Sequence, residues 1–274
     1  MSRPGLRRLF LDMEHPVRPR NWTAFLFIAI VTILALMTVI PLYWMVTTAL
    51  TPAALTVRFP PELFPSEPTL RNFEEILRRP GFIMWVTNST VMAVVVTVFT
   101  VLTASMAGYA FAKLPFRGQK PLFWVHIMAV MLPGEAILVP LFIIVTRLGM
   151  VDTYQGLILP LLAAPFGVFL MKQFIQTLPS ELLDSARVDG ANEWQVFQKI
   201  VLPMVRPGMA FLGIITFVNM WNLFVWPLVA TRSADMRTLQ VGLVLIRDEE
   251  PLFYGLHMAG ATLAAIPIVI VFFA

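Results

Sequence analysis

Long apolar runs, separated by short polar segments, dominate the pattern along the chain. A transmembrane helix needs about 20 consecutive apolar residues, because the hydrocarbon core of a bilayer is about 30 Å thick. The pattern therefore predicts an all-α, polytopic membrane protein with six transmembrane helices. These helices are expected at about 25–49, 84–112, 121–145, 155–176, 207–230 and 257–274.

The second apolar run differs from the others in its many small and hydroxyl-bearing residues. Such residues let helices approach closely and form hydrogen bonds with one another in lipid. We therefore expect this helix to lie inside the bundle. The residues concerned are Ser89, Thr90, Thr97, Thr100, Thr103, Ala104, Ser105, Ala107 and Gly108.

The longest polar interruption in the second half of the chain, residues 179–207, has the pattern of two short helices joined by a tight turn. Ser180 is a good N-cap for the first helix, and Glu181 places negative charge near its start. Gly190 predicts the end of that helix, because glycine accepts the left-handed conformation after a C-cap. One apolar face is expected from Leu182, Leu183, Ala186 and Val188.

The second short helix of this stretch is predicted to start at Asn192, with Gln195 three residues later in a capping-box arrangement. Pro203 is expected to end it. Its apolar face would consist of Trp194, Phe197, Ile200 and Val201. A hairpin of two small helices with apolar faces has the shape of a docking element.

The composition agrees with a membrane protein and excludes several other classes. Charged residues are 13% of the chain and the mean hydropathy is +0.78, whereas a soluble domain carries about 25% charged residues. The apolar runs do not alternate, which argues against a β-barrel. Without cysteines, disulfides and thiolate metal sites are excluded. The net charge of +4 does not indicate a nucleic-acid partner, because the basic residues lie beside the apolar runs.

Basic residues near the N-terminus predict the orientation in the membrane. By the positive-inside rule, residues 1–24 form a cytoplasmic segment that precedes a transmembrane domain at 25–274. Alternation then places 113–120 and the hairpin in the cytoplasm, and it places 51–83, 146–154 and 231–256 outside. The arginines that carry this prediction are Arg3, Arg7, Arg8, Arg18 and Arg20.

The expected extracytoplasmic segment 51–83 is rich in proline. Leu70, Phe73 and Ile76 have the spacing of a short amphipathic helix that would end before Pro80. An ordered cap over the transmembrane helices and a simple connecting loop both remain open.

Two apolar runs contain polar residues that are candidates for a solute path. Pro133, Gly134 and Glu135 interrupt the third run, and broken helices in transporters line substrate cavities. A carboxylate at such a depth is costly unless it faces a cavity or a partner. The fifth run combines amides and aromatic rings, which suit a neutral, hydroxyl-rich ligand such as a sugar. Its candidates are Asn219, Trp221, Asn222 and Phe224. The structural alternatives are interfacial tryptophans, asparagines that bridge helices, and a glutamate that satisfies backbone groups freed by the proline.

The polar hairpin resembles the EAA motif of ABC importer permeases. In that motif a Glu-Ala-Ala triplet is followed after three residues by glycine and later by I-x-L-P. Here the triplet is Asp184-Ser185-Ala186, the glycine is Gly190, and Ile200-Val201-Leu202-Pro203 closes the motif. Asp184 and Ser185 depart from the usual Glu and Ala, but they keep an acid and a compact residue.

The resemblance extends over nearly the whole chain and favours the carbohydrate-uptake, MalG-like branch of these permeases. It includes the Pro179, Glu181-Leu182 lead, the Asp189-Gly190-Ala191 run, Pro133 and Pro140, Leu148-Gly149 with Gly156-Leu157-Ile158-Leu159-Pro160, and Trp221-Asn222-x-Phe224 with Pro227-Leu228. The family usually continues past the sixth helix into a basic tail, whereas this sequence stops at Ala274.

The resemblance implies the type I ABC importer permease fold in a prokaryotic cytoplasmic (inner) membrane. It implies a heterodimer with a MalF-like second permease, two ABC ATPases that bind ATP and Mg, and an extracytoplasmic solute-binding protein. This chain itself would bind no cofactor, and the solute would be a sugar or a sugar-like molecule. The residues expected to couple to the ATPase are Glu181, Leu182, Asp184, Ser185, Ala186, Asp189, Gly190, Ala191, Phe197, Leu202 and Pro203. Among these, a side chain at Gly190 is expected to clash or to strain the turn.

Three other functions remain open at this level. An ABC permease for a polyol or a glycerol-phosphate-type solute would share every motif described above. An ion-coupled secondary transporter would need several intramembrane acids, and Glu135 is the candidate. A membrane enzyme would need catalytic groups clustered at one depth of the membrane, and no such cluster is visible in the sequence.

Overall fold

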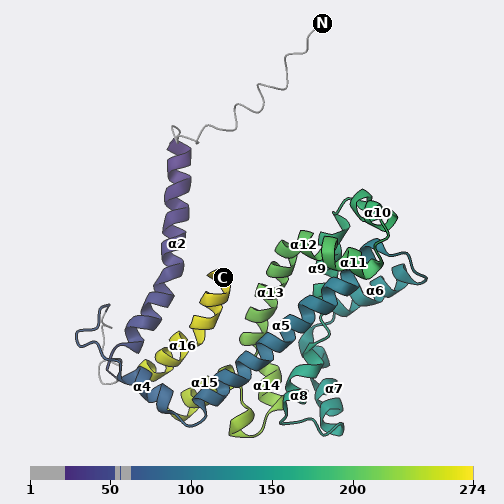
Figure 1. Cartoon of the computed structure of the whole chain (residues 1–274). Coiled ribbons are helices and arrows are strands. Elements are labelled where there is room, and N and C mark those ends of the chain that lie inside the picture. The colour runs from purple at the N-terminus through teal and green to yellow at the C-terminus, as the bar shows by residue number, and fades with distance from the viewer. Residues whose placement is uncertain (1–21, 53–55, 57–62, 274) are drawn as a thin grey trace.

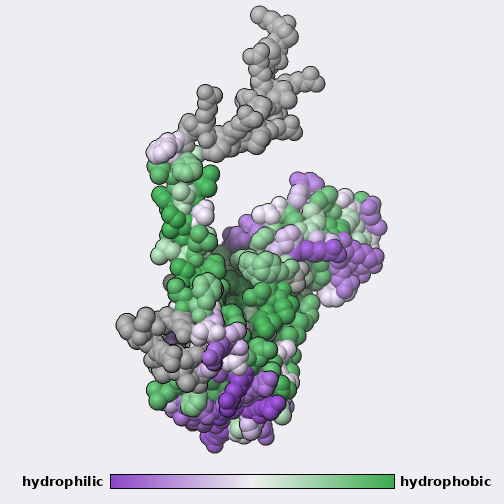
Figure 2. Space-filling model, turned by 90° about the vertical axis from the view of Figure 1, so that its left-hand side faces the viewer, coloured by the Kyte–Doolittle hydropathy of each residue, from purple (hydrophilic) through white to green (hydrophobic). Residues whose placement is uncertain are grey.

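The computed structural model describes residues 22–52, 56 and 63–273, and this part of the chain is helical without strands. The predicted cytoplasmic segment, with the five arginines that carry the orientation, lies almost wholly outside the described residues. Figure 2 shows hydrophilic residues gathered at two opposite ends of the molecule, with hydrophobic surface between them. This distribution is typical of a protein that crosses a bilayer.

Three helices are long and apolar enough to cross a membrane on their own, namely α2 (Trp22–Ala49), α5 (Phe82–Lys113) and α16 (Tyr254–Phe273). Three bent helix pairs are also apolar enough when taken together, and counting each pair as one span brings the described residues to up to six spans. The pairs are α6 (Gln119–Val130) with α7 (Gly134–Arg147), bent by 98°; α8 (Tyr154–Ile158) and η1 (Leu159–Leu161) with α9 (Pro165–Gln176), bent by 42°; and α11–α12 (Glu193–Met204) with α13 (Arg206–Trp221), bent by 75°.

The third, fourth and fifth apolar runs are therefore broken helices, and the interruption expected at Pro133-Gly134-Glu135 in the third run is found. Pro133 and Pro165 lie at the breaks in the third and fourth runs. A helix breaks at such a position because proline has no N–H and disfavours a helical conformation in the residue before it. The fifth run is also split, since α13 ends at Trp221 and α14 (Val225–Ala230) follows. Pro227 in the first turn of α14 could not have continued the hydrogen-bond ladder of α13.

Helix α5 lies at the centre of the bundle, where it packs against α9 and α13 (Figure 1). The small residues of α5 allow close approach, as predicted from the sequence. A Cβ atom built on Gly108 would lie 2.8 Å from the backbone nitrogen of Lys172 in α9. Buried Ser105 satisfies its hydroxyl by donating to the carbonyl oxygen of Val101 at 2.6 Å. The expectation that the second apolar run lies inside the bundle is confirmed.

Helix α2 stands away from the rest of the molecule along most of its length (Figure 1). It packs against α16, and its C-terminal residues Thr47 and Ala49 are buried there. Its other apolar side chains are largely exposed, and Figure 2 shows them as a hydrophobic column. This helix therefore presents most of its surface to lipid or to another subunit.

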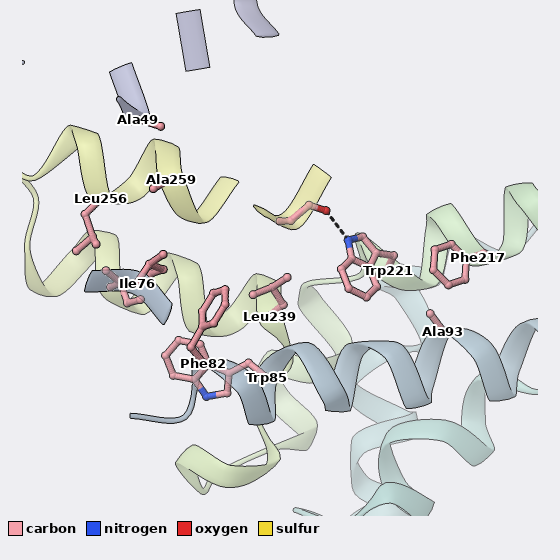
Figure 3. Packing of buried hydrophobic residues seen from close by; sticks show 12 residues of the cluster. Ala49, Ile76, Phe82, Trp85, Ala93, Phe217, Trp221, Leu239, Leu256 and Ala259 are labelled. Atoms are coloured by element: carbon pink, nitrogen blue, oxygen red, sulfur yellow. Dashed lines mark hydrogen bonds between the residues drawn. The ribbon is translucent and has the colours of Figure 1, made fainter. Parts of the chain in front are cut away.

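The described part of segment 51–83 is ordered and includes α4 (Arg71–Arg78), the short helix that the sequence predicts. Asn72 is buried and donates to the carbonyl oxygens of Ala49 at 2.8 Å and Thr51 at 2.9 Å. Ile76 joins a core cluster with residues from α5, α13, α15 (Leu239–Glu249) and α16 (Figure 3). An ordered cap, rather than a loose connection, thus covers this end of the bundle.

The loop between α14 and α15, residues 231–238, is fastened to α5 by hydrogen bonds. Fully buried Asn88 donates to the carbonyl oxygens of Asp235 at 2.6 Å and Arg237 at 2.9 Å. Ser89 accepts a bond from the backbone nitrogen of Leu239 at 2.8 Å. This loop, which includes η3 (Ala234–Met236), is therefore a fixed part of the bundle.

Asp152 holds the same loop from another side. Its Oδ1 accepts from the backbone nitrogens of Arg232 at 2.8 Å and Ser233 at 3.0 Å. These bonds, above all that from Arg232, hold the pKa of the Asp152 carboxyl below its ordinary value. Asp152 itself has a φ of 62°, a conformation that aspartate tolerates better than most residues.

The contact between α5 and α9 at Gly108 provides a test of the packing. We expect Gly108→Ala to lower the free energy of unfolding by about 1–3 kcal/mol, because the obstructing atom belongs to the backbone and cannot rotate away. Gly213→Ala in α13 is the matched control, since its Cβ would meet no atom closer than 3.8 Å. Thermal unfolding in detergent measures both, and equal melting temperatures for the two variants would contradict the packing described.

Candidate functional site

The polar stretch 179–207 forms a helical hairpin at one end of the bundle, and we call it the coupling hairpin (Figure 1). Its first helix is α10 (Ser180–Val188), and the N-cap position belongs to Pro179. The prediction of Ser180 as the N-cap is therefore wrong. Instead, the Ser180 hydroxyl accepts a hydrogen bond from Nζ of Lys113 at the end of α5, at 3.3 Å.

The turn after α10 is centred on Gly190, which has a φ of 87°. The nitrogen of Gly190 donates to the carbonyl oxygen of Arg187 at 3.1 Å, and that of Ala191 donates to Ala186 at 2.9 Å. This bond pair is the Schellman motif, which confirms the expected glycine turn. A Cβ on Gly190 would meet no atom within 4 Å, so the expected clash is absent within this chain and the constraint is the left-handed backbone.

The second half of the hairpin starts with the capping box that the sequence predicts. Asn192 Oδ1 accepts from the nitrogen of Gln195 at 2.9 Å, and Gln195 Oε1 accepts from the nitrogen of Asn192 at 2.9 Å. The helix runs through α11 (Glu193–Val196), a wider π-helical turn η2 (Phe197–Val201) and α12 (Leu202–Met204).

Pro203 does not end this helix, contrary to the prediction. The wide η2 turn precedes it, with the nitrogen of Leu202 donating to the carbonyl oxygen of Phe197 in place of the residue four positions back. Proline has no N–H to donate to the helix, and a wide π-helical turn is one of the irregularities that interrupt the regular hydrogen-bond ladder. The chain bends by 75° only after Met204, where α13 begins.

The apolar residues of the hairpin divide between two environments, which the predicted single faces did not anticipate. Leu183, Val196, Phe197 and Val201 are buried against α5 and α9. Leu182, Val188 and Trp194 are instead 46%, 87% and 55% exposed. The hairpin therefore anchors itself with one apolar set and presents another outward.

A notch of about 450 Å³ lies beside the glycine turn, where α10 and the second half of the hairpin diverge. Asp189, Gly190, Gln195 and Lys199 contribute to its lining. Glu181, Ser185 and Asp189 are exposed on the outer surface, and Ala186 and Ala191 are partly buried. Of the remaining predicted coupling residues, Phe197 is buried, Leu202 is partly buried against the same core, and Pro203 is exposed.

Asp184 occupies the acidic position of the triplet but has a partner inside the chain. Its Oδ1 accepts from Arg187 Nη1 at 2.7 Å. Arg187 also binds both oxygens of Glu193, and these bonds raise the pKa of its guanidinium above the ordinary value. Sequence reasoning missed Arg187 and Glu193, although their charges and their positions on either side of Gly190 were a usable signal.

A cavity of about 450 Å³ lies among α5, α7, α9, α13 and α14. Most of its lining is apolar, with Glu135 and Asn219 among the polar exceptions. Thr100 also lines it, and the buried Thr100 hydroxyl has no hydrogen-bond partner in the described structure. Two of the predicted path residues, Glu135 and Asn219, are therefore brought together at one hollow.

The other three path candidates lie away from this cavity. Trp221 is 1% exposed, stacks on Phe217 at 5.9 Å, and donates from Nε1 to the carbonyl oxygen of Ala264 at 2.9 Å (Figure 3). Asn222 is exposed and donates from Nδ2 to the carbonyl oxygen of Val218 at 2.9 Å. Phe224 is partly buried at the N-cap of α14. The break after Trp221 separates Asn222 and Phe224 from Asn219, whereas Trp221 shares α13 with Asn219 but is buried against Phe217. The assignment of these three residues to the path stays a prediction that this placement does not support.

Several curated proteins are similar to this chain over most of its length. The arabinooligosaccharides transport system permease protein AraQ of Halalkalibacterium halodurans is 37% identical over 249 residues, which are 90% of this chain and 88% of that protein. The lactose transport system permease protein LacG of Rhizobium radiobacter is 32% identical over 250 residues, 90% and 89% of the two chains. The sn-glycerol-3-phosphate transport system permease protein UgpE of Brucella abortus is 31% identical over 242 residues, 84% and 85% of the two chains.

The fold is also similar to a solved structure. A chain of a bacterial ABC transporter involved in the import of the acidic polysaccharide alginate superposes with a TM-score of 0.80 at 20% identity, over 94% of this chain and 96% of that one. Residues 100–274 match the family model described as binding-protein-dependent transport system inner membrane component. The chain therefore belongs to this family, the membrane-spanning permease components of ABC importers.

Proposed function

We propose that this chain is one of two permease subunits of an ATP-driven importer, and that it moves a sugar or a sugar-like solute into the cytoplasm. The observation that carries the proposal is the coupling hairpin, whose Gly190-centred turn projects exposed acidic and apolar residues from one end of the bundle. Membership of the family favours this function over the ion-coupled transporter and the membrane enzyme.

The proposed assembly places the hairpin and residues 1–24 in the cytoplasm, with one of two ABC ATPases docked on the hairpin. The ATPases would bind ATP and Mg, and hydrolysis would take place there. The MalF-like second permease would cover exposed apolar surface, for which α2 offers the largest area. A solute-binding protein would dock on the opposite end, where α4 and the fixed loop 231–238 lie.

The cavity favours a neutral solute over an anionic one. The described residues that line it include the carboxylate of Glu135 and neither lysine nor arginine. A phosphate group would meet like charge there without a cation to pair with, which is unfavourable in a poorly solvated site. Asn219 and Thr216 can instead bond to sugar hydroxyls. This chemistry supports a carbohydrate rather than a glycerol phosphate.

The mechanism follows from how the hairpin is attached. Closure of the ATPases on ATP would displace the coupling hairpin, which is joined to α13 through a 75° bend and to α5 through buried contacts. Both helices line the cavity, so their movement would change the side from which the solute has access. ATP binding can shift this equilibrium only through its different affinities for the two states.

Purification of a tagged chain from its native membrane tests the assembly. We expect an ABC ATPase and a second permease to co-purify, and the complex in proteoliposomes to take up labelled arabinotriose or lactose, but not glycerol 3-phosphate, when ATP is supplied. A chain that purifies without an ATPase would overturn the proposed function. Uptake of glycerol 3-phosphate alone would overturn the solute class and leave the assembly intact.

Gly190→Pro tests the glycine turn as the docking element. Proline cannot adopt the φ of 87° and removes the N–H that donates to Arg187, so we expect loss of the ATPase from the purified complex with the chain still in the membrane. Gly190→Ala is the control, because it costs about 1–2 kcal/mol of backbone strain and its Cβ meets nothing within 4 Å. Normal transport-coupled ATP hydrolysis by Gly190→Pro would contradict the role of the turn.

Asn219→Leu and Asn222→Leu distinguish the cavity from the sequence run as the solute path. Asn219 lines the cavity, so we expect its replacement to lower uptake roughly tenfold through the loss of a hydrogen bond to the solute, with ATPase docking intact. Asn222 lies outside the cavity, and its replacement should change uptake much less. Initial uptake rates in proteoliposomes decide between them, and the reverse order would place the path at Asn222.

A further inference from the structure

One carboxylate, that of Glu193, joins three separate helices at the base of the coupling hairpin. Glu193 is the first residue of α11, and its Oε2 accepts a hydrogen bond from Tyr109 Oη of α5 at 2.5 Å. Its Oε1 accepts from Arg187 Nε of α10 at 2.8 Å, and Arg187 Nη2 donates to Oε2 at 3.2 Å. The bidentate geometry fixes the direction of the carboxylate as well as its position.

The bond from α5 lies at the edge of the buried core, because Tyr109 is only 4% exposed while the side chain of Glu193 is 47% exposed. The ring of Tyr109 packs on Phe197 with ring centroids 5.5 Å apart, and the ring of Trp194 also contacts Phe197, with centroids 5.6 Å apart. Apolar contacts of this kind hold the hairpin near α5 but tolerate sliding, because burial is non-directional. The hydroxyl–carboxylate bond is directional, so it sets the orientation of the hairpin on α5.

Helix α5 connects the attachment point at Tyr109 with the cavity. Tyr109 and the cavity residue Thr100 lie on the same uninterrupted helix α5, nine residues or about 13 Å apart along its axis. Lys113, one turn beyond Tyr109, donates to the carbonyl oxygen of Leu178 at 2.6 Å in the segment leading into the hairpin. A rotation of the hairpin that keeps these bonds must rotate α5 with it.

We propose that Tyr109, Glu193 and Arg187 form a hairpin clamp, which makes the coupling hairpin and α5 move as one body when the ATPase moves the hairpin. The proposal rests on the proposed function and adds the route by which motion leaves the hairpin. The three are positioning residues. They hold Asp184 through Arg187, and they leave the exposed Glu181 and Asp189 to contact the ATPase.

Two small changes test the clamp. Tyr109→Phe removes one oxygen atom and keeps the ring contacts, and Glu193→Gln keeps the shape of the carboxylate but removes its charge. The control is Tyr43→Phe, which also removes a hydroxyl bond, from Tyr43 to the carbonyl oxygen of Leu63 at 2.6 Å, but on α2. If Glu193→Gln does not assemble, Tyr109→Phe decides alone.

The readout is the distance between spin labels on the hairpin and on α5 in the purified complex with its ATPases. The chain has no cysteines, so cysteines introduced at the exposed positions Gln198 and Val98 are its only thiols. The driver is Mg-ATP, which makes the measurement independent of the solute. In the parent protein and in Tyr43→Phe, we expect one distance that Mg-ATP leaves unchanged.

In Tyr109→Phe and Glu193→Gln, Mg-ATP should produce a second distance. The loss of a hydrogen bond to a charged group should increase the fraction of complexes that show the second distance roughly tenfold. The double variant should show no larger fraction at the second distance than Glu193→Gln alone, because both changes break the same bond. Basal ATP hydrolysis should persist, since the docking residues are untouched.

Three outcomes would overturn the inference in different ways. An unchanged single distance in both variants would show that apolar packing alone carries the motion. Additive effects in the double variant would show that Tyr109 and Glu193 do not act through one bond. A complex that contains no ATPase would overturn the proposed function, and the clamp with it.

Discussion

The close contact of α5 with α9 is the constraint on which the rest of the structure depends. At Gly108 the two backbones approach so nearly that no Cβ atom fits between them. Lipid offers little hydrophobic driving force between helices, so tight packing of small residues has to hold the bundle together. This contact places α5 at the centre of the bundle. Helix α13, the hairpin and loop 231–238 are each positioned by their contacts with α5.

Polar groups on α5 are placed where they have partners. Asn88 and Ser89 bond to the loop after α14 at one end, and Tyr109 and Lys113 bond to the hairpin at the other. A buried polar group without a partner costs free energy comparable to a lost hydrogen bond. Thr97 and Thr100, between the two ends, are exceptions because their buried hydroxyls have no partner in the described part of the chain.

The local signals in the sequence predicted the elements that depend on neighbouring residues. The Asn192 capping box, the Gly190 turn and the helix around Ile76 are each specified by a few adjacent side chains, and each is found. Pro133 and Gly134 likewise mark the break in the third apolar run, whereas the break after Trp221 was not predicted, because the apolar residues on either side of it read as one segment.

The candidate site was predictable in part for the same reason. The hairpin is a contiguous motif, so its two helices and its turn could be predicted from adjacent residues, and its coupling residues followed from the resemblance to the EAA motif. The cavity and the Glu193 attachment depend on residues far apart in the chain, such as Tyr109 and Glu193, whose meeting is decided by packing. Trp221 shows that a suitable residue type is not enough. An aromatic ring suits a sugar, but the indole of Trp221 stacks on Phe217 and donates to the carbonyl oxygen of Ala264.

The loop 231–238 is fastened to α5, the same helix to which the hairpin is attached, and this shared attachment links the two thermodynamically. A protein that binds this loop more tightly in one position of α5 than in another stabilises that position. By linkage, it must change the affinity of the hairpin for its own partner by the same factor, and the reverse holds equally. A protein bound to loop 231–238 would then change the affinity of the hairpin for its partner through α5 alone, and neither bound protein would need to contact the solute.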